Sequence, residues 1–238
     1  MRKMSANELL EKNRYDIEDL REVFSYLRGE NGCPWDKIQT HESIRANLIE
    51  ETYEVVEAID TADLGLLREE LGDLLLQVVF HAGIEEENGT FTFDDVVSDV
   101  TDKLIRRHPH VFGDIKANDE EGALNAWESA KLVEKTERKT AVDSMNAVPP
   151  SLPALMRAQK ILKKAMKADY SPDHILKSGA EKLRVLADLM ENEGKEISAE
   201  LIGDALFAVS AFSQVNDVDG ELQLSIKSDK FISNFEEN

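Results

Sequence analysis

The stretch LIEETYEVVEAID, at residues 48–60, decides how the first half of this chain is organised. Its apolar residues recur at the three- and four-residue spacing of a helix, and all of its charged residues are acidic. Like charges at that spacing on a helix repel one another by roughly a few tenths of a kcal/mol per pair. Glu50 with Glu54, and Glu54 with Glu57, are two such pairs. Either these acids are tolerated on a face exposed to water, or a cation offsets their repulsion.

The composition of the whole chain narrows the class of protein. The 238 residues suit one large domain or two of ordinary size, either with a real core. A net charge of −20 argues against nucleic acid or an anionic membrane as a bulk partner. No apolar run approaches the ~20 residues of a membrane span, the N-terminus does not resemble a secretory signal, and the single cysteine fits a reducing compartment. We therefore expect a soluble, cytoplasmic protein.

Helical periodicity runs through almost the whole sequence, which predicts an all-α fold. A first helix is predicted from Ser5 or Asn7 to about Gly29. Further helices are predicted at about 41–60, 63–88, 93–107, 119–139, 154–168, 173–193 and 197–214, followed by a short last segment. The proline-rich stretch AVDSMNAVPPSLP, at 141–153, is predicted to be a linker. The domains are then a helical bundle at 1–140 and a second helical domain at 154–238.

The acids lie at the margin of the predicted apolar stripes. With ~100° per residue, Glu51 stands beside the stripe of Leu48, Val55 and Ile59, and Glu54 lies about 60° away. The next helix repeats this arrangement with Glu70 and Asp73. Antiparallel packing of the two helices across a short connection brings both acidic pairs together.

A metal ion is the better explanation for these four carboxylates. A single Glu-x-x-Glu pair is well explained as a solvated helix face. Four carboxylates, however, cannot share a half-buried pocket while ionised unless a cation neutralises them. All-oxygen ligation selects a hard cation, Mg²⁺ before Mn²⁺ or Ca²⁺.

The spacing Glu50-Glu51-x-x-Glu54, then Glu70-x-x-Asp73, resembles the metal-binding motif of the MazG family of nucleoside triphosphate pyrophosphohydrolases. Several other stretches resemble tandem-domain members of this family. They are GCPWDKIQTH at 32–41, EELGDLL at 69–75, KLIRRHPHVFGD at 103–114, WESAK at 127–131 and PSLPALMRAQKI at 150–161. The resemblance covers residues 15 to about 165 and fades afterwards.

The resemblance implies an all-α homodimer that hydrolyses ribo- or deoxyribonucleoside triphosphates to the monophosphate and pyrophosphate, in nucleotide-pool house-cleaning or a stress response. It implies Mg²⁺ as the cofactor, with Mn²⁺ as a substitute. Glu51, Glu54, Glu70 and Asp73 are then the ligands, and Glu50 is a further ligand or orients the attacking water. A catalytically weak protein that senses nucleotides or binds a regulatory partner is the competing hypothesis.

The resemblance also implies the residues that hold the substrate. Lys103 and Arg107 become phosphate contacts, although cations at a helix C-terminus also complement the macrodipole. Trp127 and Lys131, one helical turn apart, look like the family's base-stacking and phosphate-contacting pair. Plain core packing is the alternative for Trp127.

The second half weakly repeats the first and departs from the motif. ELGDLLLQVVF at 70–80 resembles ELIGDALFAVSAF at 200–212. In the aligned positions, Lys182 and Val185 replace two acids of the first helix, and Leu201 replaces the glutamate of the second, while Asp204 keeps the aspartate. One carboxylate near a lysine is a poor Mg²⁺ site. We predict a degenerate repeat kept for packing or dimerisation.

Overall fold

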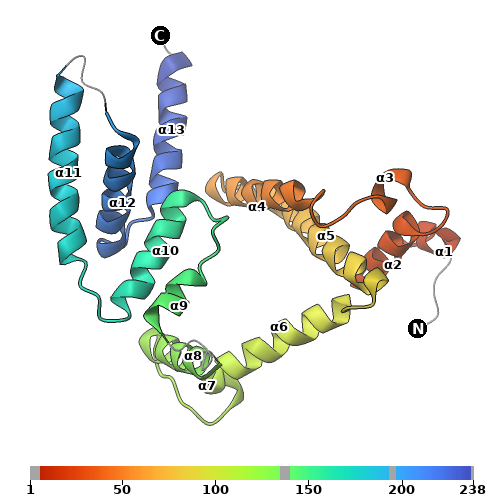
Figure 1. The fold of residues 1–238 in the computed structure, drawn as a ribbon. Coiled ribbons are helices and arrows are strands. Elements are labelled where there is room, and N and C mark those ends of the chain that lie inside the picture. Colours follow the sequence, from red (N-terminus) through yellow and green to blue (C-terminus); the bar gives the residue numbers. More distant parts are fainter. Residues whose placement is uncertain (1–5, 135–139, 193–196, 237–238) are drawn as a thin grey trace. The chain divides into compact units, whose positions relative to one another are not determined.

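The computed structural model describes residues 6–134, 140–192 and 197–236, and every regular element in these ranges is a helix. The predicted all-α class is confirmed. The chain divides into two compact units, Met1–Lys131 and Leu132–Asn238 (Figure 1). No helix within the described ranges is long and apolar enough to span a membrane.

The first unit contains α1 (Ala6–Leu10), α2 (Ile17–Arg28), α3 (Pro34–Lys37), α4 (Arg45–Asp60), α5 (Leu64–Asn88), α6 (Phe93–Arg107), α7 (Pro109–Phe112) and most of α8 (Glu120–Glu134).

Helix α5 is the central helix of the first unit, and α4, α2 and α6 pack against it (Figure 1). Asp63 caps the start of α5, because its carboxylate accepts hydrogen bonds from the backbone N–H groups of Gly65 and Leu66. Gly89 ends α5 in the left-handed conformation, with φ 71°, which glycine adopts without steric cost. Thr92 then caps α6. These signals are why α5 and α6 lie where the sequence predicts them.

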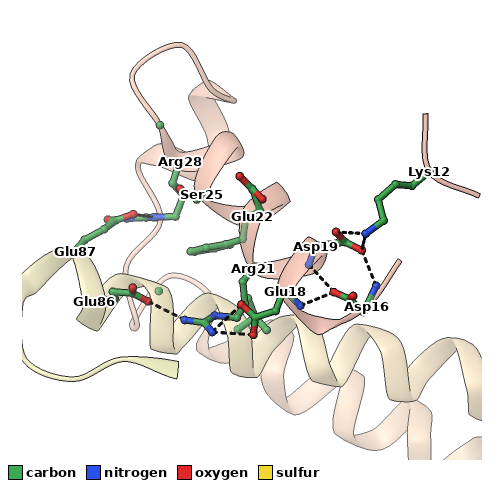
Figure 2. A pocket seen from close by; sticks show the side chains of 14 residues that line it. Lys12, Asp16, Glu18, Asp19, Arg21, Glu22, Ser25, Arg28, Glu86 and Glu87 are labelled. Atoms are coloured by element: carbon green, nitrogen blue, oxygen red, sulfur yellow. Dashed lines mark hydrogen bonds and ion pairs between the residues drawn. The ribbon is translucent and has the colours of Figure 1, made fainter. Parts of the chain in front are cut away.

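The single first helix predicted from the sequence is wrong, because the chain breaks it between α1 and α2. Asp16 caps α2 and forms a capping box with Asp19. The Asp19 side chain is 1% exposed and accepts a hydrogen bond of 2.6 Å from Lys12 Nζ (Figure 2). This half-buried ion pair spans the break, because residues 11–16 lie outside a helix. The apolar spacing continues across the break, which is why periodicity missed it.

Other element boundaries also shift. The helix predicted from His41 begins at Arg45, because Thr40 and Ser43 exchange backbone-to-hydroxyl hydrogen bonds in a turn before it. The predicted helix 119–139 is α8, and its expected last residues, 135–139, lie outside the described ranges.

The core of the first unit lies where α2 crosses α5. Phe24 and Phe80 meet edge to face with ring centroids 4.8 Å apart. Gly83 lies against the Phe24 ring, and a Cβ at this glycine would come within 2.0 Å of it. The buried core comprises Phe24, Ile44, Val79, Phe80, Ala82, Ile84 and Phe93.

Arg28 fastens three parts of the first unit together. Its Nε and Nη2 donate to the two carboxylate oxygens of Glu87 on α5, each at 2.7 Å (Figure 2). Its Nη1 donates to the carbonyl oxygens of Asp36 and Gln39, at 2.6 and 3.1 Å. The guanidinium thereby joins α2, α5 and the segment that leads into α4.

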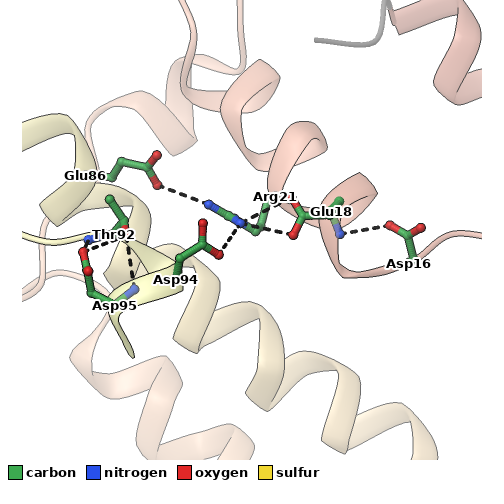
Figure 3. Close-up of polar contacts among 7 residues, drawn as sticks. All are labelled: Asp16, Glu18, Arg21, Glu86, Thr92, Asp94 and Asp95. Carbon is green, nitrogen blue, oxygen red and sulfur yellow. Dashed lines mark hydrogen bonds and ion pairs between the residues drawn. The ribbon is translucent and has the colours of Figure 1, made fainter. Parts of the chain in front are cut away.

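Arg21 makes a second connection, between α2 and the region where α5 gives way to α6. Its Nη1 donates to Asp94 at 2.8 Å, and its Nη2 lies 3.9 Å from Glu86 (Figure 3). The guanidinium also lies 5.2 Å from the ring centroid of Phe93. The start of α6 is therefore held against α2.

The second unit is a smaller helical bundle around α12. It contains α9 (Ala141–Asn146), α10 (Ala154–Met166), α11 (Asp173–Glu191), α12 (Ala199–Val215) and α13 (Gly220–Glu236). Helix α12 packs against α10, α11 and α13. The predicted linker 141–153 includes α9, which begins at a capping box between Thr140 and Asp143 and packs on α10. The predicted short last segment is the long helix α13.

The contact between Gly83 and Phe24 gives a test of the α2–α5 packing. Gly83→Ala should destabilise the protein by about 1–3 kcal/mol, because the new methyl group must displace the Phe24 ring. Gly72→Ala on the same helix is the control, since a Cβ there meets nothing within 4 Å. It should be neutral or stabilise by about 0.5–1 kcal/mol. Urea unfolding monitored by circular dichroism measures both, and equal effects would contradict the packing.

Candidate metal centre

Acidic side chains from α4 and α5 converge in the first unit. Glu51 of α4 and Glu70 and Asp73 of α5 each offer an oxygen, and these oxygens all lie within 4.8 Å of one another. Glu54, one turn after Glu51, lies close enough to raise the pKa of both Glu51 and Glu70. We refer to Glu51, Glu54, Glu70 and Asp73 as the carboxylate cluster.

Without a bound cation, the ionised carboxylates of the cluster repel one another. Burial, the contact with Glu54 and the charge of Asp73 raise the pKa of Glu51. Burial and the charges of Glu54 and Asp73 raise the pKa of Glu70, which is only 8% exposed. Oxygen ligands of one Mg²⁺ ion are at most about 4 Å apart, so a small side-chain movement suffices to bring these oxygens onto one ion. The donor set fits a hard divalent cation.

Glu50 stands apart from this group. It precedes Glu51 on α4 but is exposed, and it is not one of the residues whose oxygens converge. Its predicted role, as a further ligand or as the group that orients water, stays a prediction.

Gln77 is a neighbour of the cluster that the sequence analysis missed. It lies one turn beyond Asp73 on α5 and is 8% exposed. Its Nε2 is 3.5 Å from Oε1 of Glu51. The spacing of Glu70, Asp73 and Gln77 on one helix face is a signal that the sequence already contained.

A second polar group, formed by His41, His81 and Glu85, connects the segment before α4 to the C-terminal half of α5. Nε2 of His41 lies 2.7 Å from Oε1 of Glu85, and Nδ1 of His41 lies 2.7 Å from Nδ1 of His81. Hydrogen bonds from Thr90 and His41 lower the pKa of Glu85. Since that carboxylate only accepts, His41 donates through Nε2 and accepts from His81 at Nδ1. This chain of contacts fixes where α4 starts relative to α5.

The predicted substrate residues form a separate basic cluster. Nζ of Lys131 lies 4.4 Å from the centroid of the Trp127 ring, and the Arg107 guanidinium lies 5.7 Å from it. Lys103 is exposed one turn before Arg107 on α6. The structure thus groups Arg107, Trp127 and Lys131, with Lys103 nearby on the same helix face.

A cleft of about 930 Å³ opens elsewhere in the first unit, between α2 and α5 (Figure 2). Its described charged groups are largely paired with one another, as in Lys12 with Asp19 and Arg28 with Glu87. None of the predicted site residues lines it. The carboxylate cluster is therefore the candidate functional site, because its side chains converge, whereas the cleft is marked only by its size.

The equivalent position in the second unit holds an internal ion pair. Lys182 and Asp204 are 22 residues apart, as Glu51 and Asp73 are, and Nζ of Lys182 donates to Asp204 at 2.6 Å. Asp204 in turn raises the pKa of Lys182. A lysine ammonium therefore contacts the aspartate from the position that Glu51 occupies in the first unit.

The fold and the cluster together describe an all-α protein with a candidate divalent-metal centre. The model of the MazG nucleotide pyrophosphohydrolase domain matches residues 39–112, a range that contains the whole carboxylate cluster. The chain is 39% identical over 222 residues to the Thermotoga maritima nucleoside triphosphate pyrophosphohydrolase/pyrophosphatase MazG, covering 92% of this chain and 84% of that protein. It is 38% identical over 229 residues to the nucleoside triphosphate pyrophosphohydrolase of Escherichia coli K12, covering 93% and 86%.

The Bacillus subtilis protein YabN is 48% identical over 149 residues, which are 63% of this chain and 30% of YabN. This chain therefore spans about a third of YabN and most of the other two relatives. The chain belongs to the MazG family.

The raised pKa values predict how charge at the cluster affects stability. A carboxyl group with a raised pKa holds its proton more tightly in the folded state, so its contribution to stability is present below the unfolded pKa of about 4.3 and is lost as pH rises through the folded value. In EDTA, Glu51→Gln should therefore unfold at a higher temperature than wild type at about pH 8 and differ less at about pH 5. Thermal unfolding by circular dichroism measures this difference.

Glu57→Gln is the matched control, because Glu57 is exposed on the same helix and should not alter the pH dependence. Mg²⁺ should stabilise the wild type and the control but not Glu51→Gln. A Glu51→Gln variant that is less stable than wild type throughout would contradict the charge repulsion.

Proposed function

We propose that this chain hydrolyses nucleoside triphosphates to the monophosphate and pyrophosphate, with Mg²⁺ held at the carboxylate cluster. The observation that carries the proposal is the convergence of Glu51, Glu70 and Asp73, with Glu54 beside them, inside the MazG domain. The T. maritima and E. coli relatives, which carry the pyrophosphohydrolase name, support it.

The proposed metal ligands are Glu51, Glu54, Glu70 and Asp73. A divalent cation bound there supplies Lewis-acid polarisation of the phosphate oxygens and neutralises their charge. In the reaction, the oxygen of one water bonds to the α-phosphorus, the bond from that phosphorus to the α–β bridging oxygen breaks, and pyrophosphate leaves. Glu50, exposed beside the cluster, is the proposed group that orients this water and takes its proton.

The basic cluster is the proposed site for the rest of the substrate. Lys103, Arg107 and Lys131 supply cationic groups for the phosphates, and Trp127 supplies a ring on which any base can stack. In the structure, Arg107 and Lys131 already lie over this ring. We infer that an incoming base must share or displace these contacts.

We propose a homodimer, and exposed apolar side chains support it. Ile49, Tyr53 and Val56 on α4 are 51%, 53% and 42% exposed, and Ile59, predicted to face the core, is 58% exposed. They follow the three- and four-residue spacing of one helix face. A second copy is a suitable cover for an apolar face of this kind.

We propose the cytoplasm as the compartment, in keeping with a single cysteine.

Product analysis tests the activity directly. With Mg²⁺ and a panel of ribo- and deoxyribonucleoside triphosphates, anion-exchange chromatography should show monophosphate and pyrophosphate in equal amounts. Glu70→Gln should reduce turnover by about 100-fold or more while the circular dichroism spectrum stays unchanged. Diphosphate with orthophosphate as products would contradict the proposal. Nucleotide binding without turnover would favour the nucleotide-sensing alternative. That alternative is motivated by the second unit, in which an ion pair stands at the position of the carboxylate cluster.

A second test separates base binding from phosphate binding. Trp127→Ala should raise KM for all triphosphates by a similar factor, about tenfold or more, because stacking does not read the edge of the base. Lys103→Ala and Arg107→Ala should lower kcat as well, because charge on the leaving pyrophosphate grows in the transition state. Steady-state kinetics measures both constants. Loss of stability with unchanged KM in Trp127→Ala would make the indole a core residue.

A further inference from the structure

One buried side chain beside the carboxylate cluster uses only half of its hydrogen-bonding groups. Gln77 is 8% exposed, and its Oε1 is buried without a hydrogen-bond partner among the described residues. We propose that Gln77 is a positioning residue of the metal centre. Its amide N–H orients Glu51, and its carbonyl oxygen accepts a hydrogen bond from a water molecule of the loaded site. This inference rests on the proposed function.

The orientation of the Gln77 amide follows from the chemistry of its neighbour. A carboxylate only accepts hydrogen bonds, so the group that faces Oε1 of Glu51 at 3.5 Å is the NH₂ group. The carbonyl oxygen must then point elsewhere, and it is the atom left without a donor. The contact to Glu51 is long and leaves room for a tighter one when Glu51 is drawn into ligation.

The hydrogen-bond donor for Oε1 of Gln77 is one that enters the site together with the metal. Leaving a buried acceptor without a donor destabilises a fold, and such atoms need a specific explanation. Mg²⁺ usually keeps several of its waters, and each of these presents O–H groups to neighbouring acceptors. A water of the loaded site is thus a donor of the required kind. Residues that hold metal ligands and waters in this way commonly tune affinity and rate.

The position of Gln77 on α5 suits this role. It follows Asp73 by four residues and Glu70 by seven, so the three side chains lie along one face of the helix. Glu51 approaches that face from α4 and touches Gln77 as well as the cluster. Gln77 therefore lies at the end of the cluster, one turn from Asp73.

The second unit supplies an internal comparison. Its aligned residue, four after Asp204, is Ala208, which is 1% exposed. A Cβ at Gly179 of α11 would come within 2.5 Å of the Ala208 side chain, so α11 and α12 close together at this position. The unit that has Lys182 in place of the carboxylate also lacks the amide. This joint loss is expected if the amide serves the metal centre.

Gln77→Met tests the inference, because methionine has a similar volume and cannot hydrogen-bond strongly. Electron paramagnetic resonance of Mn²⁺, without nucleotide, should show a dissociation constant raised about 10–100-fold. The melting temperature of the metal-free variant should equal or exceed that of wild type, because the unpaired acceptor is gone. Gln77→Leu provides a second variant in case methionine disturbs packing. The kcat with Mg²⁺ and a nucleoside triphosphate should fall as well.

Leu74→Met is the matched control, since Leu74 is half-buried on the preceding part of α5 and is not a proposed ligand. It should leave the Mn²⁺ affinity unchanged. A folded Gln77→Met or Gln77→Leu variant with Mn²⁺ affinity within about twofold of wild type would overturn the inference. So would a lower melting temperature with unchanged affinity, which would make Gln77 a core residue. If the wild type binds Mn²⁺ but releases no pyrophosphate, the proposed function fails, and the Mn²⁺ affinities still decide the role of Gln77.

Discussion

Mutual repulsion of the carboxylates on α4 and α5 is the constraint that the packing of the first unit must overcome. A helix pair that brings Glu51, Glu70 and Asp73 within 4.8 Å of one another tends to separate unless other contacts hold it. Those contacts lie at a distance from the cluster. The buried core, in which Ile44 before α4 packs with Val79 and Phe80 of α5, and the contact between His41 and Glu85 provide them. The carboxylate cluster is therefore held together by packing elsewhere in the unit, at an electrostatic cost that a cation bound at the proposed centre would offset.

The net charge of −20 affects which form of the proposed nucleotide substrate can approach the protein. A free triphosphate carries about four negative charges and is repelled at long range, whereas its complex with Mg²⁺ carries about half of that charge. The basic side chains around Trp127 act at short range, where screening by salt is weak. The proposed division of the site, acids for the metal and cations for the phosphates, suits an acidic protein that receives its nucleotide as a metal complex.

The sequence predicted those parts of the fold that local signals determine. Helices α5 and α6 begin and end near their predicted bounds, because Asp63, Gly89 and Thr92 act on their own neighbours in the chain. The break before α2 coincides with the capping box of Asp16 and the ion pair of Lys12 with Asp19, and apolar spacing carries no information about either. The carboxylate cluster could be predicted because its spacing is helical. The role inferred for Gln77 could not, since an unpaired oxygen is a property of the packed structure.

The ion pair between Lys182 and Asp204 makes the two units differ in what they require from their surroundings. A cation that belongs to the polypeptide cannot dissociate, compete with other metals or be removed by a chelator. The helix pair of the second unit thus carries its own cation, whereas the proposed metal centre of the first unit would depend on free divalent ions. With Mg²⁺ bound at the proposed centre, a fall in free Mg²⁺ would loosen the helix pair α4 and α5 and leave the pair α11 and α12 unchanged.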